Sequence, residues 1–288
     1  MKSVRRELFP EVIEGILGPE NLTDWRTKME TKETAKVDIL GLALRDYLGG
    51  VRNQSFVHRD DGFSDREPIE RYFKTFTEWS PVEQKLLAEL SGTVLETGCN
   101  RGEHLRYLQE RGVDAFGVDI CPGAVQLAQE AGIKNCLLMD ARRLNFERKF
   151  DTVLMLYYGF GLGGTVDGQK ELLRNLHRLT TEHGRIIASS IDALKTTVPQ
   201  HLAYQEFNRQ KGKAYGNVTQ VTLRLQHQDY FGGWYDLLFV NPAGMAELIS
   251  GIGWKLTKAI PEKEGGRAWY YILDKCADTS NPDDRKGG

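Results

Sequence analysis

Apolar and polar positions change their spacing several times along the chain, and the central part repeats one pattern. Between residues 92 and 191, short apolar runs alternate with longer segments in which leucines recur every three or four positions. The predicted strands are 93–96, 113–119, 135–139, 150–156 and 184–189. The predicted helices are 105–112, 122–132 and 168–183. Repeated strand–helix units with short connections indicate a parallel sheet covered by helices on both faces.

The segments on either side of this part have other patterns. Before it, apolar residues spaced by three and four predict an amphipathic helix over residues 32–48, and a polar loop is expected at 57–67. After it, alternation around the Gly232-Gly233 pair predicts a β-hairpin, and Asn241-Pro242 begins a helix. Two closing strands, 254–260 and 268–274, add an antiparallel pair, which simple dinucleotide-binding sheets do not need.

These elements predict an α/β fold with a seven-stranded, mostly parallel sheet whose last strand is antiparallel. Helices are expected on both faces, with a β-hairpin inserted late in the chain. Residues 1–80 are expected to form a helical lid over a main domain at 81–275, and the polar residues 276–288 a disordered tail.

Charge and composition narrow the expected partners. The 288 residues carry a formal net charge of -2, which provides no general field to attract a phosphate backbone, so nucleic acid is an unlikely partner. The first residues lack the apolar run of a secretion signal, and the most apolar stretch, 153–164, is too short to span a bilayer. The four cysteines have no zinc-site spacing. We expect a cytoplasmic monomer or homodimer that binds no membrane and no metal.

The carboxyl ends of the predicted strands are the first candidates for chemistry, because an open parallel sheet binds ligands there. The first strand ends in Glu96-Thr97-Gly98-Cys99-Asn100-Arg101-Gly102, where glycines permit a sharp turn and a close approach to a ligand. The second and third glycines of the nicotinamide fingerprint are missing. A carboxylate two residues before the first glycine suits a cofactor that carries an ammonium group.

Two further acids stand at strand ends. Asp119 ends the second strand, where a carboxylate can accept hydrogen bonds from both ribose hydroxyls. Asp140 ends the third strand, where its carboxylate can accept a hydrogen bond from an exocyclic amine. Each acid alone is equally well explained as a helix cap, but the three in this order indicate an adenosine-bearing ligand with an amino acid end.

With these strand ends, the chain resembles the class I S-adenosylmethionine (SAM) dependent methyltransferases over roughly residues 80–275. The resemblance implies their Rossmann-like fold, SAM as the cofactor and methyl transfer as the activity. It implies that Glu96, Gly98 and Gly102 line the methionine end, that Asp119 holds the ribose, and that Asp140 and Ala141 hold the adenine. The other expected cofactor-binding residues adjoin these positions and are Cys99, Asn100, Ile120 and Leu156. Asn100 replaces the middle glycine that the family usually has, and asparagine tolerates left-handed backbone angles.

The fourth strand ends in Leu156-Tyr157-Tyr158-Gly159, the position beside the reactive methyl in the resembled fold. It lacks the Asn/Asp-Pro-Pro-aromatic motif of enzymes that methylate adenine or glutamine nitrogen, and the Pro-Cys pair of those that attack pyrimidine C5. Tyr157 and Tyr158 are predicted to present an aromatic face to the sulfonium. The alternative is that they pack under the following loop.

A direct displacement needs a base only if the acceptor must lose a proton. The candidate bases are His58, His104, His201 and Tyr204. Of these, His104 is included with Tyr157 and Tyr158 in the predicted catalytic set. Its alternative roles are to orient the cofactor turn or to pack against the N-terminal helices. For His58, His201 and His227 a place at the surface is the competing interpretation.

In the resembled fold, an N-terminal helical segment and an insertion after the fifth strand often cover the acceptor, and this chain has both. The residues predicted to line the acceptor pocket are aromatic or histidine: Tyr72, Phe73, Trp79, His201, Tyr204 and Trp234. Such a pocket favours a small-molecule methyl acceptor. Two alternatives remain open: an RNA or protein methyltransferase of the same fold, and a protein that binds SAM as a sensor or for other chemistry.

Overall fold

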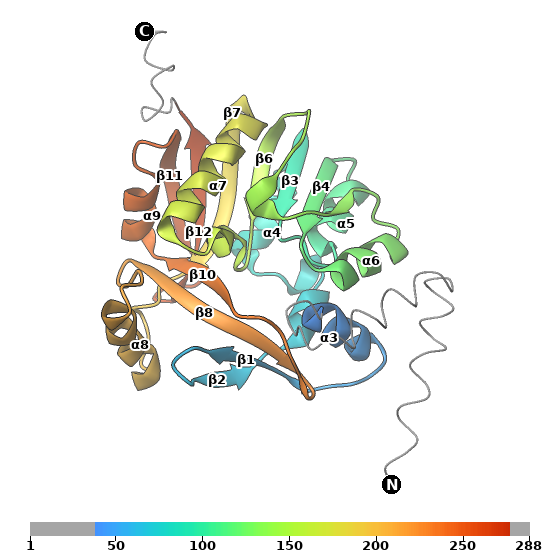
Figure 1. Ribbon diagram of the computed structural model, residues 1–288. Helices are drawn as coiled ribbons and strands as arrows, with labels where there is room; N and C mark the ends of the chain where they lie inside the picture. The colour runs from blue at the N-terminus through green and yellow to red at the C-terminus, as the bar shows by residue number, and fades with distance from the viewer. Residues whose placement is uncertain (1–37, 277–288) are drawn as a thin grey trace.

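The computed structural model describes residues 38–276 and arranges them around two β-sheets (Figure 1). The larger sheet has seven strands in the order β11-β12-β7-β6-β3-β4-β5. Its strands are β3 (Thr93–Thr97), β4 (Asp114–Asp119), β5 (Cys136–Leu138), β6 (Phe150–Met155), β7 (Thr180–Ile191), β11 (Trp254–Pro261) and β12 (Ala268–Lys275). Strands β3 to β7 pair in parallel, whereas β12 pairs antiparallel with both β7 and β11. The predicted sheet and its antiparallel last strand are confirmed.

Helices cover both faces of this sheet because its strands are apolar on both sides. Successive residues of β6 alternate between two cores: Val153 belongs to the core under α7 (Val166–Leu179) and α9 (Pro242–Ile249), and Leu154 to the opposite one. That second core lies under α4 (Pro81–Ala88), α5 (Glu103–Glu110) and α6 (Pro122–Glu130). Short 3₁₀ helices lie between these elements along the chain: η2 (Ile69–Phe73), η3 (Phe76–Glu78), η4 (Ala141–Arg143) and η5 (Gly159–Gly163).

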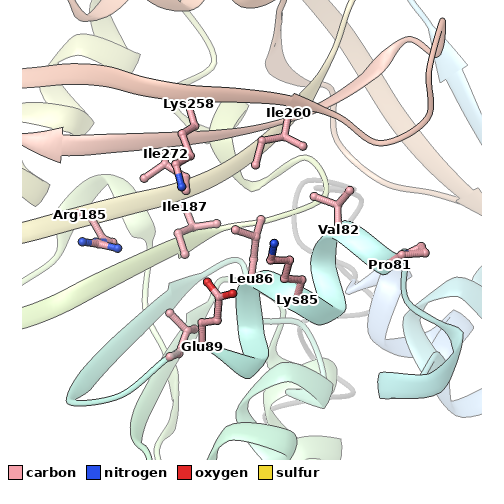
Figure 2. Close-up of a pocket in the computed structure, with 11 residues that line it drawn as sticks. Pro81, Val82, Lys85, Leu86, Glu89, Arg185, Ile187, Lys258, Ile260 and Ile272 are labelled. Atoms are coloured by element: carbon pink, nitrogen blue, oxygen red, sulfur yellow. The ribbon is translucent and has the colours of Figure 1, made fainter.

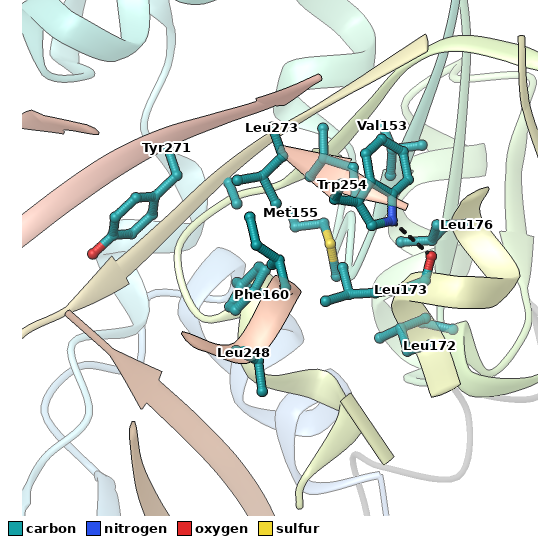
Figure 3. Close-up of a cluster of buried hydrophobic side chains, with 14 of the residues drawn as sticks. Val153, Met155, Phe160, Leu172, Leu173, Leu176, Leu248, Trp254, Tyr271 and Leu273 are labelled. Carbon is teal, nitrogen blue, oxygen red and sulfur yellow. Dashed lines mark hydrogen bonds between the residues drawn. The ribbon is translucent and has the colours of Figure 1, made fainter. Parts of the chain in front are cut away.

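Figure 3 shows the first core, where Trp254 of β11 reaches the backbone of α7. The indole Nε1 of Trp254 donates to the carbonyl oxygen of Leu173 at 2.9 Å, so this buried polar atom is partnered. The helix α7 is shorter than the predicted 168–183 segment. Thr180 already belongs to β7, where it pairs with Phe150 of β6, because β-branched residues favour a strand.

The second sheet has the order β10-β8-β1-β2, with β9 paired to β8. Its strands are β1 (Ser55–Arg59), β2 (Ser64–Arg66), β8 (Val218–His227), β9 (Tyr230–Phe231) and β10 (Tyr235–Val240). The predicted hairpin is the β8–β10 pair. The loop expected at 57–67 is wrong, since β1 and β2 form an antiparallel pair there and β1 also pairs with β8. The N-terminal segment is therefore not purely helical.

The second sheet lies beside the carboxyl end of β6, with α3 (Ile39–Leu48) near one end and α8 (Pro199–Gln210) near the other (Figure 1). A Cβ on Gly161 of η5 would lie 2.3 Å from the carbonyl oxygen of Leu238 in β10, so only a glycine permits this approach. At the other end, α3 packs on α6, and a Cβ on Gly41 would lie 2.8 Å from the Cα atom of Gly123. These two backbone contacts fix the smaller sheet over the strand ends.

Several expectations concern residues outside the described range. The predicted helix 32–48 is described from Asp38, which caps α3 by accepting the backbone N–H of Gly41 at 2.7 Å. Residues 1–37 of the predicted lid lie outside the described residues, as do residues 277–288 of the predicted tail. Within residues 38–276, every helix is too short or too polar to cross a membrane.

Candidate functional site

The turn after β3 has the backbone that a close approach to a ligand requires. Gly98 has φ +72°, Asn100 +51° and Gly102 +75°, all in the left-handed region. Asn100 thus adopts the conformation for which asparagine is tolerated, and its Oδ1 accepts the N–H of Arg101 at 2.9 Å. A Cβ on Gly102 would lie 2.9 Å from Cδ1 of Ile133, the movable end of a side chain, so it is the left-handed φ of Gly102 that favours glycine here.

Asp119 at the end of β4 connects this turn to the next one. Its two carboxylate oxygens accept the backbone N–H groups of Asn100 at 2.7 Å and Cys121 at 2.8 Å. Burial raises the pKa of Asp119. Each oxygen has a second lone pair, so the carboxylate can still accept from a ligand hydroxyl. Ile120 follows, 65% exposed, and offers an apolar surface beside the carboxylate.

Asp140 at the third strand end is already engaged by a neighbour. It caps η4 and accepts the backbone N–H of Arg142 at 2.9 Å and the guanidinium of the same residue at 2.7 Å. The hydrogen bonds from Arg142 hold the pKa of Asp140 below its usual range. Ala141 beside it is buried. An exocyclic amine at this place would share the Asp140 carboxylate with Arg142.

Beneath the glycine turn, a buried histidine lies between two buried carboxylates. His104 Nδ1 lies 2.5 Å from Oε1 of Glu96, and His104 Nε2 lies 2.9 Å from Oε1 of Glu83. Burial alone would lower the pKa of His104, but the two carboxylates, Glu96 first, raise it to about 10. Both ring nitrogens are occupied, so His104 has no free nitrogen to take a proton from an acceptor, and the base role predicted for it has no support in this geometry.

One oxygen of this buried cluster is left without a partner. Glu96 Oε2 is buried and accepts no hydrogen bond within the described part of the chain. Two carboxylates and one imidazolium leave one negative charge, and burying such a charge without a donor is costly. A ligand ammonium would supply both the missing donor and the missing charge. The residues present therefore fit a cofactor with an amino acid end.

Aromatic rings hold His104 from two sides. The Trp79 ring meets it edge-on at 4.5 Å between centroids, and the Tyr157 ring lies parallel to it at 5.8 Å. Trp79, predicted to line an acceptor pocket, is instead buried against this cluster. Tyr157 has φ +53°, an uncommon conformation for a bulky residue and one that clusters at functional sites. Tyr157 is also 45% exposed, so it forms part of the open surface.

Tyr158 belongs to a second polar group, formed with the second sheet and η2. Arg71 lies with its guanidinium carbon 5.0 Å from the Tyr158 ring centre and forms an ion pair with Glu67 at 2.6 Å. The Tyr72 hydroxyl donates to Glu67 at 3.1 Å. Burial, and then the charge of Glu67, raise the pKa of Tyr235 of β10 to about 12. We call these five residues, Glu67, Arg71, Tyr72, Tyr158 and Tyr235, the tyrosine–arginine cluster.

The other predicted acceptor residues lie elsewhere. Phe73 stacks on Tyr47 of α3 at 4.6 Å. Tyr204 is 1% exposed, and its hydroxyl donates to Asp60 at 2.6 Å inside the second sheet. His201 is half-buried on α8, and Trp234 is exposed beside Arg224. The structure thus brings Tyr72 to Tyr158 but does not bring Tyr204 there.

Sequence reasoning missed several residues of the site. Glu83 follows Ser80 by three positions, a spacing typical of a capping box, and the Ser80 hydroxyl does cap α4. The Glu83 carboxylate instead joins His104 and accepts from the Tyr270 hydroxyl at 2.7 Å. Glu67 and Arg71 pair with each other at the local i,i+4 spacing. Their proximity to Tyr158 and Tyr235 comes from distant segments, so local spacing does not indicate it.

Figure 2 shows a groove of about 330 Å³ between α4 and the face of strands β7, β11 and β12. Its lining includes Leu86, Ile187 and Ile260 and none of the residues predicted for the site. Since ligands of such sheets bind beyond the strand ends, we do not assign this groove to the site. Among residues 38–276, no group of three or more His, Cys, Asp or Glu side chains is arranged to hold a metal ion.

Comparison with known proteins agrees with this geometry. Residues 94–184 match the family model described as a methyltransferase domain. A SAM-dependent methyltransferase from Bacteroides fragilis, solved with S-adenosylhomocysteine (SAH), superimposes with a TM-score of 0.70 at 23% identity. The match covers 83% of this chain and 95% of that one. The chain has the fold of the class I SAM-dependent methyltransferases.

Two other solved structures share the methyltransferase fold at lower similarity. SAM-dependent methyltransferases from Clostridium acetobutylicum and Methanosarcina mazei both give a TM-score of 0.53, at 11% and 13% identity. The first match covers 72% of this chain and 95% of that one, and the second covers 69% and 98%. No curated protein matches the chain. The residues that match the family model, 94–184, include the glycine turn, Asp119, Asp140 and the two tyrosines that follow β6.

Proposed function

We propose that this chain binds SAM and transfers its methyl group to a small-molecule acceptor. The observation that carries the proposal is the unpartnered buried oxygen of Glu96, in a cluster with one negative charge left over. An adenosine cofactor with an ammonium group satisfies this oxygen and also explains the acid at the neighbouring strand end, Asp119. The SAH-bound structure from Bacteroides fragilis, which shares the fold, supports the same cofactor.

Each of the residues at the strand ends would contact a different part of the cofactor. Glu96 would accept from the ammonium group, and Asp119 from the ribose hydroxyls. The exposed side chain of Ile120 would cover one face of the adenine, next to Asp140. When bound, SAM supplies a methyl group on a positively charged sulfur. Tyr157, exposed at the end of β6 with a strained backbone, is the aromatic residue that we propose beside this charge.

The tyrosine–arginine cluster is the proposed acceptor side. It adjoins Tyr157 through Tyr158, and the second sheet lies over it, which limits the size of an acceptor. Its members offer hydroxyl groups, one guanidinium and one carboxylate, and the Glu67–Arg71 ion pair leaves no net charge. This favours a polar small molecule. Burial raises the pKa of Glu67, so Glu67 is the group we propose to take a proton from the acceptor.

A transfer assay tests the proposal. The wild-type chain is incubated with methyl-labelled SAM and a cell extract, and label is measured separately in small molecules, protein and RNA. We expect label in the small-molecule fraction, and less label with Glu96→Gln when SAM is present below its saturating concentration. Label in protein or RNA would contradict the small-molecule acceptor. Binding of SAH without label in any fraction would contradict methyl transfer and leave a sensor.

A further inference from the structure

A chain of hydrogen bonds runs from β12 through α4 to the glycine turn. The Tyr270 hydroxyl of β12 donates to Oε2 of Glu83 at 2.7 Å and lies 3.0 Å from the Ser80 hydroxyl. Glu83 Oε1 is hydrogen-bonded to Nε2 of His104, and His104 Nδ1 is hydrogen-bonded to Oε1 of Glu96. All of the charged members are buried, with Glu83 and Glu96 each 3% exposed and His104 5%. The chain therefore connects a rigid part of the sheet to the unpartnered oxygen of Glu96.

The geometry fixes the state of the imidazole. A carboxylate oxygen is only an acceptor, and a neutral imidazole can donate from one nitrogen alone. Because both ring nitrogens face carboxylates, the ring must carry both protons or one contact becomes repulsive. The raised pKa of His104, about 10, agrees with this charged state. Both oxygens of Glu83 are partnered, by His104 and Tyr270, whereas Oε2 of Glu96 is not.

Packing restricts the ring as well. Trp79 and Tyr157 cover an edge and a face of His104, and the Trp79 indole N–H is itself fixed on the carbonyl oxygen of Lys74 at 3.0 Å. A ring held in this way holds Oε1 of Glu96 in one place. Because the two oxygens of a carboxylate are rigidly linked, Oε2 of Glu96 is then fixed as well, and it has no hydrogen-bond partner among residues 38–276.

We propose that His104 is a positioning residue, which orients Glu96 so that Oε2 receives the ammonium group of the cofactor. Glu83 and Tyr270 extend this support to β12. The inference rests on the proposed function and deepens it. It names the residues by which this chain would select the amino acid end of the cofactor, as distinct from its adenosine. Without His104, Oε1 of Glu96 would lose its buried hydrogen-bond partner, and nothing would hold the carboxylate in this orientation.

The test compares two ligands that differ only at the amino acid end. SAH carries the ammonium group, whereas 5′-methylthioadenosine has the adenosine and a sulfur but no amino acid. Both are titrated by calorimetry into the full-length wild-type chain, His104→Gln and His183→Gln. His183 is an exposed histidine of β7 and serves as the matched control. Thermal unfolding of each variant checks that it is folded.

We expect His104→Gln to raise the Kd of SAH at least about tenfold, the usual effect of a lost hydrogen bond to a charged group. The Kd of 5′-methylthioadenosine should change by less than about threefold, and His183→Gln should change neither. Where His104→Gln does not fold, Glu83→Gln is measured in its place, with the same selective loss expected.

Equal weakening of both ligands would mean that His104 only maintains the turn, and would overturn the inference. An unchanged SAH affinity in His104→Gln or Glu83→Gln would also overturn it. The proposed function is judged separately, on the wild-type chain. If wild type binds neither ligand, the cofactor assignment fails, and this inference fails with it.

Discussion

The molecule holds two buried histidines through both ring nitrogens: His104 on α5, which packs on the larger sheet, and His227 on β8 of the second sheet. Only the cluster around His227 is complete. In the second sheet, His227 Nδ1 lies 2.7 Å from the Ser55 hydroxyl and Nε2 lies 3.0 Å from Asp46. Every buried side-chain oxygen and nitrogen of this trio is partnered within residues 38–276. At the glycine turn, Glu96 keeps an unpartnered oxygen beside His104.

The difference indicates what each cluster does. The closed cluster, formed by His227 with Ser55 and Asp46, ties the neighbouring segments α3 and β1 to β8, which lies far from both in the sequence. It leaves no buried side-chain oxygen or nitrogen of these three residues without a partner. The open cluster, formed by Glu83, His104 and Glu96, has one acceptor and one negative charge in excess. Burying an unpaired acceptor and charge lowers the stability of a protein. We infer that a closed polar cluster in this chain is structural and that the open one is a binding site.

The largest effect is expected where the open cluster meets the ligand. Glu96→Gln keeps the shape but removes the charge, so the Kd of SAH should rise about tenfold to a hundredfold. Asp46→Asn makes the same type of change in the closed cluster and should leave the Kd within about twofold. Calorimetry on both variants measures the contrast. Similar losses in the two would break the distinction between the clusters.

The reverse contrast is expected in stability. His227→Leu leaves the Ser55 hydroxyl without its buried partner and leaves Asp46 with Gln228 alone. It should lower the free energy of unfolding by about 1–3 kcal/mol. The SAH affinity of the folded variant should stay at the wild-type value. Urea unfolding and calorimetry give the two numbers. A variant with unchanged stability and weakened SAH binding would show that the second sheet's histidine belongs to the site.

A series of stability measurements at different pH values tests whether the imidazole of His104 is charged in the folded chain. Its folded pKa of about 10 lies above the ordinary 6.5, so its charge stabilises the folded chain fully below pH 6.5 and progressively less as pH rises toward 10. The stability difference between wild type and His104→Gln should therefore shrink over this interval. Urea unfolding at intervals of pH tests it, and the subtraction cancels groups common to both chains. A difference that grows with pH would contradict a charged imidazole.

The smallest effect concerns the backbone of the glycine turn. Asn100→Gly relieves a left-handed residue but frees the unfolded chain, so stability should change by less than about 1 kcal/mol. SAH affinity should change less than about threefold, because the ligand contacts we propose come from Glu96 and Asp119. Parallel urea unfolding and calorimetry check both values. A large loss of affinity would move the recognition from the carboxylates to the turn itself.

The larger sheet was predictable because its strands are continuous apolar runs and the connections are short. The order of acids at three strand ends likewise places Glu96 and Asp119 at one edge, since parallel strands end together. Asn100 was predictable in its left-handed conformation because few other residues tolerate it.

The second sheet and the open cluster depend on pairings between distant residues. Strand β1 is polar and has no apolar run of its own, and it is defined by β8, which lies more than 150 residues later. Tyr270 reaches Glu83 across 187 positions. Glu83 has the local pattern of a helix cap, so nothing near it in the sequence indicates its contact with His104. Such contacts follow from the fold and not from local spacing.

The most direct test of the account is a calorimetric titration of SAH into the wild-type chain at neutral pH. The open cluster at Glu96 predicts one site per chain with micromolar or tighter affinity. Absence of measurable binding at this affinity, in a chain shown to be folded by its cooperative unfolding, would contradict the central claim that the unpartnered oxygen of Glu96 marks a cofactor site.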